Sequence, residues 1–226
     1  MRILFCNISW MRWYKGFRYN DRITGGGKYV TENGDGCEID NFWPINNTEA
    51  AVILADGTEI DLPEGDICLG FVETGHRNGK SRQLCIERIH ECESYKQAAY
   101  AEDVLVVFCA TAPHETRSWV VGWYHHARVM RYYFEYPLND IWDSYLWKNI
   151  ICKAKDAVLL PENLRNWDVP RVARDDKGFG FGQSNVWYAD YDKPETEAWV
   201  REMYHKIMCY DGPNILYEKP ESIYSV

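Results

Sequence analysis

The chain has 226 residues and a formal net charge of −9 at pH 7, with 34 acidic residues against 25 Lys and Arg. This excess of negative charge argues against indiscriminate binding to nucleic acid, while the length suffices for one large domain with a real hydrophobic core. No apolar segment approaches the roughly 18 residues that a transmembrane helix requires, so we expect no membrane partner.

The first predicted element is a strand over residues 2–8. The opening sequence MRILFCNI has one basic residue but no extended apolar core and no small-residue cleavage site, so it does not read as a signal peptide. The eight cysteines include no C-x-x-C pair and lie mostly in apolar contexts, which is typical of reduced core thiols. We therefore expect a cytoplasmic protein.

A long loop rich in aromatic and basic residues follows this strand. Its rings and cations are interleaved: Trp10, Trp13, Tyr14, Phe17 and Tyr19 with Arg12, Lys15, Arg18 and Arg22. Rings offer stacking faces to bases and the cations between them contact phosphates, so this mixture suits nucleic acid. The GGG at residues 25–27 lacks the spacing of a nucleotide-binding loop, and a flexible hairpin tip explains it as well as a phosphate cradle does.

Charge is unevenly distributed along the chain. Residues 31–75 carry eleven acidic residues and no Lys or Arg, whereas residues 12–28 carry five basic residues and only Asp21. A protein with an acidic side and local basic loops can hold a polyanion in one place and repel it elsewhere. Ordinary solvated loops would give the same pattern, so both interpretations stay open.

Short strands are predicted in the next part of the chain. Asp56 and Gly57 give a strong hairpin signal between two apolar segments. The predicted strands cover residues 37–43, 50–54, 59–62 and 66–73, and residues 84–89 form a strand or a short helix.

Two central strands are predicted at residues 104–108 and 118–121, the second continuing at 127–130. The loop between them carries Arg117 and should project as an accessible tip. Gly122 indicates a bulge or a close backbone approach. Residues 123–126, WYHH, cannot all be buried, because successive strand side chains point to opposite faces. Some of these rings should therefore face a cavity, a partner or solvent.

The last third of the chain mixes short strands with helices. Gly178, Gly180 and Gly182 alternate with Phe179 and Phe181, which fits a loop that closes over a ligand or a tight crossing of two backbones. Strands are expected at residues 132–136, 150–154, 157–160 and 186–189, a short helix at 138–147, and a final helix that starts at Asp192 and Pro194 and ends at Gly212 and Pro213.

Familiar catalytic and metal-binding patterns are missing from the sequence. The cysteines and histidines lack the clustered spacing of a zinc site, and no G-x-S-x-G elbow occurs. We predict no metal, no other cofactor and no catalytic residue, with a non-catalytic role favoured over an enzyme. His125 and His126 are the only evident acid–base candidates.

Four segments together resemble a known family: RILFCNISWM, GGGKYV, the hairpin from VVFCATAP to VVGWYHHARVMR, and GFGFGQSNVWYAD. They resemble the N-terminal module of modification-dependent HNH restriction endonucleases and the EVE, YTH and ASCH members of the PUA-like superfamily. This resemblance implies an α+β, β-rich fold, a small PUA-like β-barrel with peripheral helices. The resemblance covers most of the chain at scattered motifs. We expect one PUA-like domain over residues 1–226, with a C-terminal helical extension at about 192–226.

The resemblance also implies a pocket that holds a modified, flipped-out base. Its matching positions are Asn7, Ser9, Trp10, Trp13, Trp123 and Tyr124, and Gln183 and Asn185 would add hydrogen bonds to the base edge. Arg12, Lys15, Lys28 and Arg117 would grip the flanking phosphates.

We therefore expect a module that binds DNA carrying a modified base and serves restriction or bacterial defence. No HNH finger is visible, so a separate nuclease or effector protein would act downstream. Two alternatives remain: an enzyme acting on a nucleobase or nucleic acid with His125 or His126 as acid and base, and a protein-interaction module that uses the acidic side.

Overall fold

The computed structural model describes residues 1–25, 30, 32, 34–74, 76–77, 80–81, 83–137, 145–172, 178–189, 191 and 193–219. Its main feature is a nine-stranded mixed sheet in the order β13-β1-β8-β9-β10-β5-β2, with β11 and β12 also paired to β9. The strands of this sheet are β1 (Ile3–Asn7), β2 (Ile45–Asn47), β5 (Gly65–Gly70), β8 (Tyr100–Thr111), β9 (Ser118–Pro137), β10 (Tyr145–Lys153), β11 (Ala157–Leu159), β12 (Asp168–Val169) and β13 (Val186–Trp187).

The remaining elements are small, apart from one helix. Two hairpins stand apart from the main sheet: β3 (Ala51–Ile53) with β4 (Glu59–Asp61), and β6 (His76–Arg77) with β7 (Lys80–Ser81). Four 3₁₀ turns, η1 (Ile86–Arg88), η2 (Glu93–Gln97), η3 (Ala154–Asp156) and η4 (Glu162–Leu164), accompany the α-helix α2 (Pro194–Met208). The predicted β-rich α+β class is confirmed, but the described strands run in an open order from β13 to β2 and no closed barrel is found among them.

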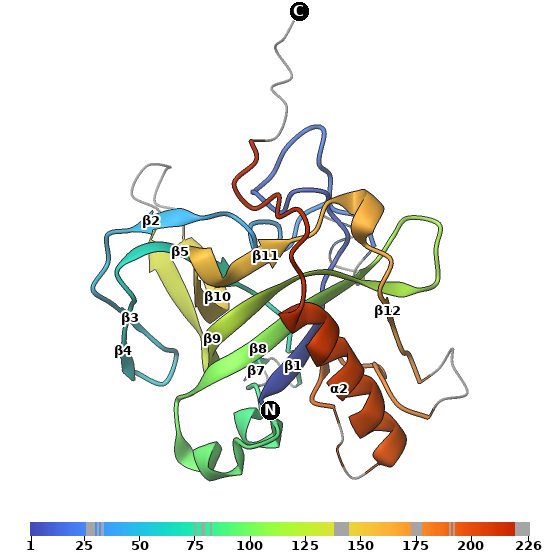
Figure 1. The fold of residues 1–226 in the computed structure, drawn as a ribbon. Helices are drawn as coiled ribbons and strands as arrows, with labels where there is room; N and C mark the ends of the chain where they lie inside the picture. Colours follow the sequence, from blue (N-terminus) through green and yellow to red (C-terminus); the bar gives the residue numbers. More distant parts are fainter. Residues whose placement is uncertain are drawn as a thin grey trace, which may run out of the picture.

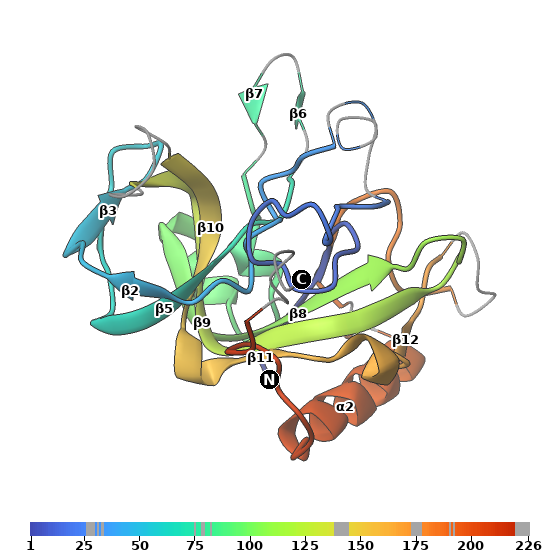
Figure 2. The ribbon, with the colours of Figure 1, turned by 90° about the horizontal axis from the view of Figure 1, so that it is seen from above.

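The predicted central hairpin is the axis of the sheet. β8 and β9 are antiparallel, while β1 lies parallel to β8. β9 is 20 residues long and pairs with four strands along its length, so the sheet curls around it. β2, β3, β5 and β10 gather at one end of β9, and β12 and α2 lie towards the other (Figures 1 and 2).

Three hydrophobic clusters pack against the sheet, and two of them lie on opposite faces of its central strands. Alternation along β1 sends Leu4 and Cys6 to one face and Ile3 and Phe5 to the other, as the two-residue period requires. α2 covers the second face through Val200, Met203 and Ile207, so the predicted final helix packs on the sheet. All eight cysteines are free thiols, as predicted.

Two predicted elements differ from the structure. Residues 37–43 form turns, not a strand, because side chains anchor them: Asp40 forms a buried ion pair with Lys148, and Asn41 exchanges two hydrogen bonds with the backbone of Phe71. The helix at 138–147 falls largely outside the described residues, and its last part belongs to β10. Asp192, the predicted helix cap, also lies outside them.

Glycines mark two places where backbones touch. A Cβ on Gly122 would lie 2.4 Å from the Val158 carbonyl oxygen, and the register slips beside it, so both predicted features occur there. Gly180 has φ +114° and a Cβ there would lie 2.1 Å from the Pro170 oxygen. Phe179 and Phe181 on either side are buried. The glycine-rich segment is therefore a tight backbone crossing.

We expect Gly180→Ala to lower the free energy of unfolding by about 1–3 kcal/mol, because the added methyl meets a carbonyl oxygen and the backbone must leave the left-handed region. Gly182→Ala is the matched control, since nothing lies within 4 Å of its Cβ position. Urea unfolding of both variants measures the difference. Equal midpoints for the two variants would contradict the crossing.

Candidate functional site

The loop from Trp10 to Thr24, here called the aromatic loop, leaves the end of β1 and rises above the sheet (Figure 1). Its ends are joined by two hydrogen bonds between the backbones of Trp10 and Thr24, at 2.7 and 2.9 Å. Inside it, the buried Asp21 carboxylate accepts hydrogen bonds from the backbone N–H groups of Arg12 and Trp13, at 2.6 and 2.8 Å. These hydrogen bonds give the aromatic loop a defined conformation.

Arg165 fastens the aromatic loop to the rest of the fold. Its guanidinium donates to the carbonyl oxygens of Met11 and Arg12, both at 2.6 Å, and to that of Leu160 at 3.0 Å. It also lies over the Trp10 ring, 5.0 Å from the centroid. Arg165 is 4% exposed and burial lowers its pKa. Its role is therefore to hold the loop against the fold.

The outer side of the loop presents two rings to solvent. Phe17 is 72% exposed and Tyr19 is 69% exposed, and the Arg22 guanidinium lies 4.9 Å from the Tyr19 centroid. The predicted pocket did not include these two residues, although the interleaving of rings and cations already pointed to them. Exposed rings beside cations are suitable platforms for unpaired bases.

A polar cluster sits at the end of β1, directly before the loop. We call Asn7, Ser118, Arg171 and Asn185 the β1-end cluster. The Asn7 backbone N–H donates to the Asn185 carbonyl at 2.7 Å, and its side-chain amide donates to Asn185 Oδ1 at 3.3 Å. Arg171 donates to Asn7 Oδ1 and, at 2.5 Å, to Ser118 Oγ. Two predicted site residues, 178 positions apart in the sequence, are thus in contact.

Three other predicted residues lie near this cluster in the chain. Ser9 is buried, and its hydroxyl donates to Glu38 Oε1 at 2.8 Å, so it anchors the start of the loop. Gln183 is exposed, two positions before Asn185. Trp10 is half-buried. Arg171 was missed, because nothing in the sequence around it indicates that it reaches β1.

The predicted aromatic pocket is not formed. Trp123 is 1% exposed and stacks on Trp167 at 5.6 Å, whereas Tyr124 is fully buried against Phe42 and Phe108 on the opposite face of β9. Trp13 is also buried, 6% exposed. Consecutive strand residues cannot share one cavity, because their side chains point to opposite sides of the sheet. Trp123 and Tyr124 are therefore core residues, and their assignment to a base pocket was wrong.

The predicted phosphate contacts divide into three groups. Arg12 and Arg117 are exposed, although Arg12 also lies 3.6 Å from the Glu162 carboxylate and 4.7 Å from the Trp13 centroid. Lys15 was assigned wrongly: it is buried, its ammonium donates to the carbonyl oxygens of Ile215 and Glu218, and burial lowers its pKa. Lys28 lies outside the described residues.

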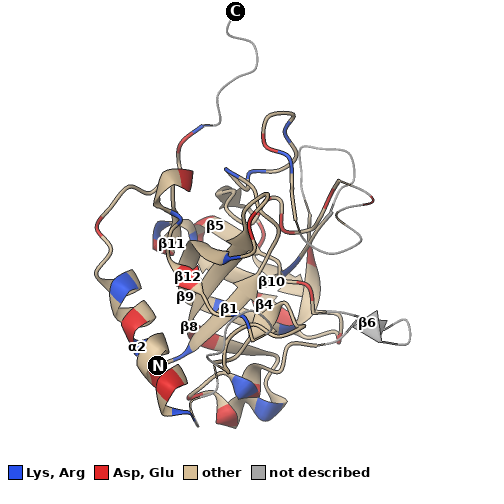
Figure 3. Ribbon diagram, turned by 90° about the vertical axis from the view of Figure 1, so that its right-hand side faces the viewer, with Lys and Arg blue, Asp and Glu red and all other residues tan. Residues whose placement is uncertain are grey.

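Helix α2 carries charges of both signs. Along α2, acidic and basic residues alternate (Figure 3), and Glu197 pairs with Arg201 at 2.7 Å. Within the described residues, no helix combines the length and apolarity needed to cross a membrane.

Three comparisons give no further guide to identity. The chain matches no protein-family model, no curated protein and no solved structure.

Proposed function

We propose that the chain is a DNA-binding module that recognises a modified, flipped-out base, with the β1-end cluster and the aromatic loop as its site. The proposal keeps the expected role in restriction or bacterial defence, in which a separate nuclease or effector acts on the bound DNA. It also takes the curled sheet as a PUA-like barrel. The site assigned here recognises its ligand without catalysis.

The observation that carries the proposal is the contact among Asn7, Asn185 and Arg171. Amides present both donors and acceptors, and a guanidinium presents a fixed fork of donors, so the three groups suit the edge of a base. Asn7 and Asn185 are half-buried. Their mutual hydrogen bonds hold the amides in place before a ligand arrives, which lowers the ordering entropy lost on binding.

The aromatic loop supplies the second part of the interface. Phe17 and Tyr19 are exposed for stacking, and the Arg22 guanidinium lies over the Tyr19 ring. The exposed Arg12 belongs to the same loop. Stacking of about 1–3 kcal/mol per base offsets the few kcal/mol needed to take a base out of the duplex. The net charge of −9 would repel DNA elsewhere and confine it to this end of the molecule.

The proposal is tested by fluorescence anisotropy with otherwise identical duplexes that carry one modified cytosine, one modified adenine or none, across a range of salt. We expect at least one modified duplex to bind about tenfold or more tightly than the unmodified one, because edge contacts discriminate by about 1–3 kcal/mol. Affinity should fall as salt rises, with a slope that reflects a few phosphate contacts. Negligible or equal binding to all duplexes at low salt would reject the proposal.

A further inference from the structure

Two bulges that cancel each other bring Asp103 and His126 together in the middle of the β8–β9 pair. Ala101 pairs with Val129 and Val104 with Ala127, so β8 has one extra residue in that interval. Val106 then pairs with Tyr124, so β9 has one extra residue in the next interval and the original register returns. Asp103 lies in the first of these intervals and His126 in the second. The two side chains meet, with His126 Nδ1 2.6 Å from Asp103 Oδ1.

Both residues adopt a backbone conformation that side chains disfavour. Asp103 has φ +56° and His126 has φ +50°, a region that non-glycine residues rarely adopt because Cβ comes too close to the following carbonyl oxygen. The two side chains are 68% and 71% exposed, and solvent screening leaves an ion pair this exposed too weak to explain the backbone conformation. The pairing of the strands beyond the bulges does not depend on them, because the register is unchanged. Such bulges re-aim side chains and concentrate at functional sites.

The contact fixes which nitrogen of His126 carries the proton when the ring is neutral. A carboxylate only accepts hydrogen bonds, so Nδ1–H is the donor and Nε2 keeps its lone pair. Within the described chain Nε2 has no hydrogen-bond partner. The Asp103–His126 pair, here called the dyad, therefore presents the Nε2 atom of His126 to solvent as an oriented hydrogen-bond acceptor.

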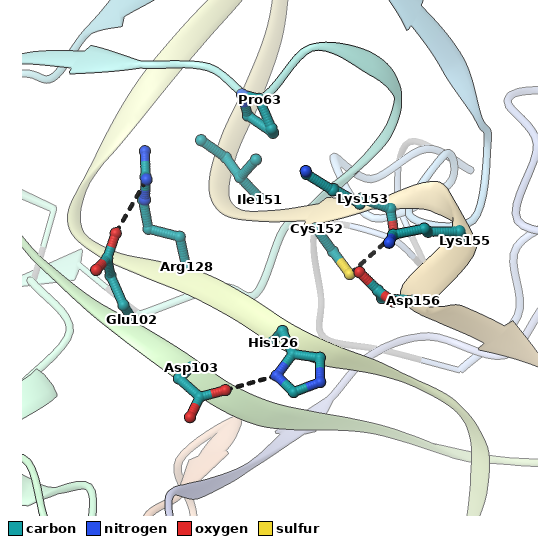
Figure 4. A pocket seen from close by; sticks show the side chains of 10 residues that line it. All are labelled: Pro63, Glu102, Asp103, His126, Arg128, Ile151, Cys152, Lys153, Lys155 and Asp156. Atoms are coloured by element: carbon teal, nitrogen blue, oxygen red, sulfur yellow. Dashed lines mark hydrogen bonds and ion pairs between the residues drawn. The ribbon is translucent and has the colours of Figure 1, made fainter.

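This acceptor lies in a hollow. The dyad borders two cavities of about 470 and 290 Å³, the larger of which is shown in Figure 4. Glu102 and Arg128 line the larger one and neutralise each other at 3.0 Å. Lys153 and Lys155 line it too, and neither ammonium has an ion-pair partner among the described residues. Asp156 is the remaining carboxylate.

We propose that this hollow, here called the dyad groove, is a second binding site that takes a phosphate ester of nucleotide size. Lys153 and Lys155 bind the phosphate, and His126 Nε2 accepts a hydrogen bond from a hydroxyl or N–H group of the same ligand. Asp103 is a positioning residue that holds the ring. The groove is separate from the β1-end cluster: Asn7 pairs with Cys109, six residues along β8 from Asp103, or about 20 Å.

The test is a titration of the imidazole ¹⁵N resonances with adenosine monophosphate, with inorganic phosphate and with an unmodified duplex. We expect saturable shifts of His126 with the nucleotide at a Kd of about 1 mM or below. The Lys153→Gln/Lys155→Gln double variant should weaken nucleotide and phosphate binding by about tenfold or more. His126→Asn keeps a residue that tolerates positive φ and should weaken nucleotide binding by about threefold to tenfold while phosphate still binds.

The exposed Lys96 of η2 provides the control, and Lys96→Gln should leave both affinities unchanged. Asp103→Asn should alter the tautomer of His126, seen as a change in the separation of its two nitrogen shifts. No saturable shift of His126 with the nucleotide, or equal losses in the Lys96 and Lys153/Lys155 variants, would overturn the proposal. Saturation by the duplex alone would assign the groove to the DNA backbone and also overturn it.

Discussion

Replacing Arg165 with Met is expected to lower the free energy of unfolding by about 3–5 kcal/mol, the range found when one partner of a buried polar network is removed. The reason is the number of groups left without a donor: the carbonyl oxygens of Met11, Arg12 and Leu160. Each buried unsatisfied carbonyl costs about 1–3 kcal/mol. The variant also removes the cation over Trp10, so the aromatic loop should detach before the rest of the fold.

Urea unfolding measures the total loss, and amide hydrogen exchange of residues 10–24 measures the local one. Arg201→Met is the matched control: that arginine is exposed on α2 and pairs with Glu197 one turn earlier, so its loss should cost below about 1 kcal/mol. If the two variants were equally stable, the hydrogen bonds of Arg165 would not be what holds the aromatic loop in place.

The second large effect concerns binding. Asn7→Ala should reduce the preference for a modified duplex about 10- to 100-fold, because it removes one amide from the base edge and one hydrogen bond that orients each of the Asn185 and Arg171 side chains. Affinity for an unmodified duplex should change little, since phosphate contacts dominate it. The two affinities, measured at one salt concentration, give the ratio.

A control variant separates this effect from a general loss of binding. Asn46 is exposed on β2, and Asn46→Ala should leave the ratio as in the wild type. Asn7→Ala must also retain the wild-type unfolding midpoint to within about 1 kcal/mol for the comparison to hold. A folded Asn7→Ala protein with an unchanged ratio would remove Asn7 from the site.

Much of the fold follows from local patterns in the sequence. The apolar run at 104–108 predicted β8, Asp56 and Gly57 predicted the β3–β4 hairpin, and Pro194 predicted the start of α2. These signals are local, so neighbouring residues suffice to read them. Residues 37–43 were assigned wrongly because Asp40 and Asn41 are held by Lys148 and Phe71, which no local pattern shows.

The candidate site was only partly predictable for the same reason. Asn7 and Asn185 were chosen separately and meet in the structure, but Arg171 joins them through a crossing that the sequence does not reveal. Trp123 and Tyr124 were assigned to the pocket through the family resemblance, yet strand alternation places them in two different cores. The bulges that bring His126 to Asp103 depend on the register between β8 and β9. This register could not be predicted from the sequence of either strand.

The most direct test of the account is a titration of the protein with a modified duplex, observed through the side-chain ¹⁵N–¹H₂ resonances of Asn7 and Asn185. Both amides should show large, saturable shifts with the preferred modified duplex and small ones with the unmodified duplex. Saturable binding in which these two amides do not move, while resonances elsewhere on the molecule do, would contradict it.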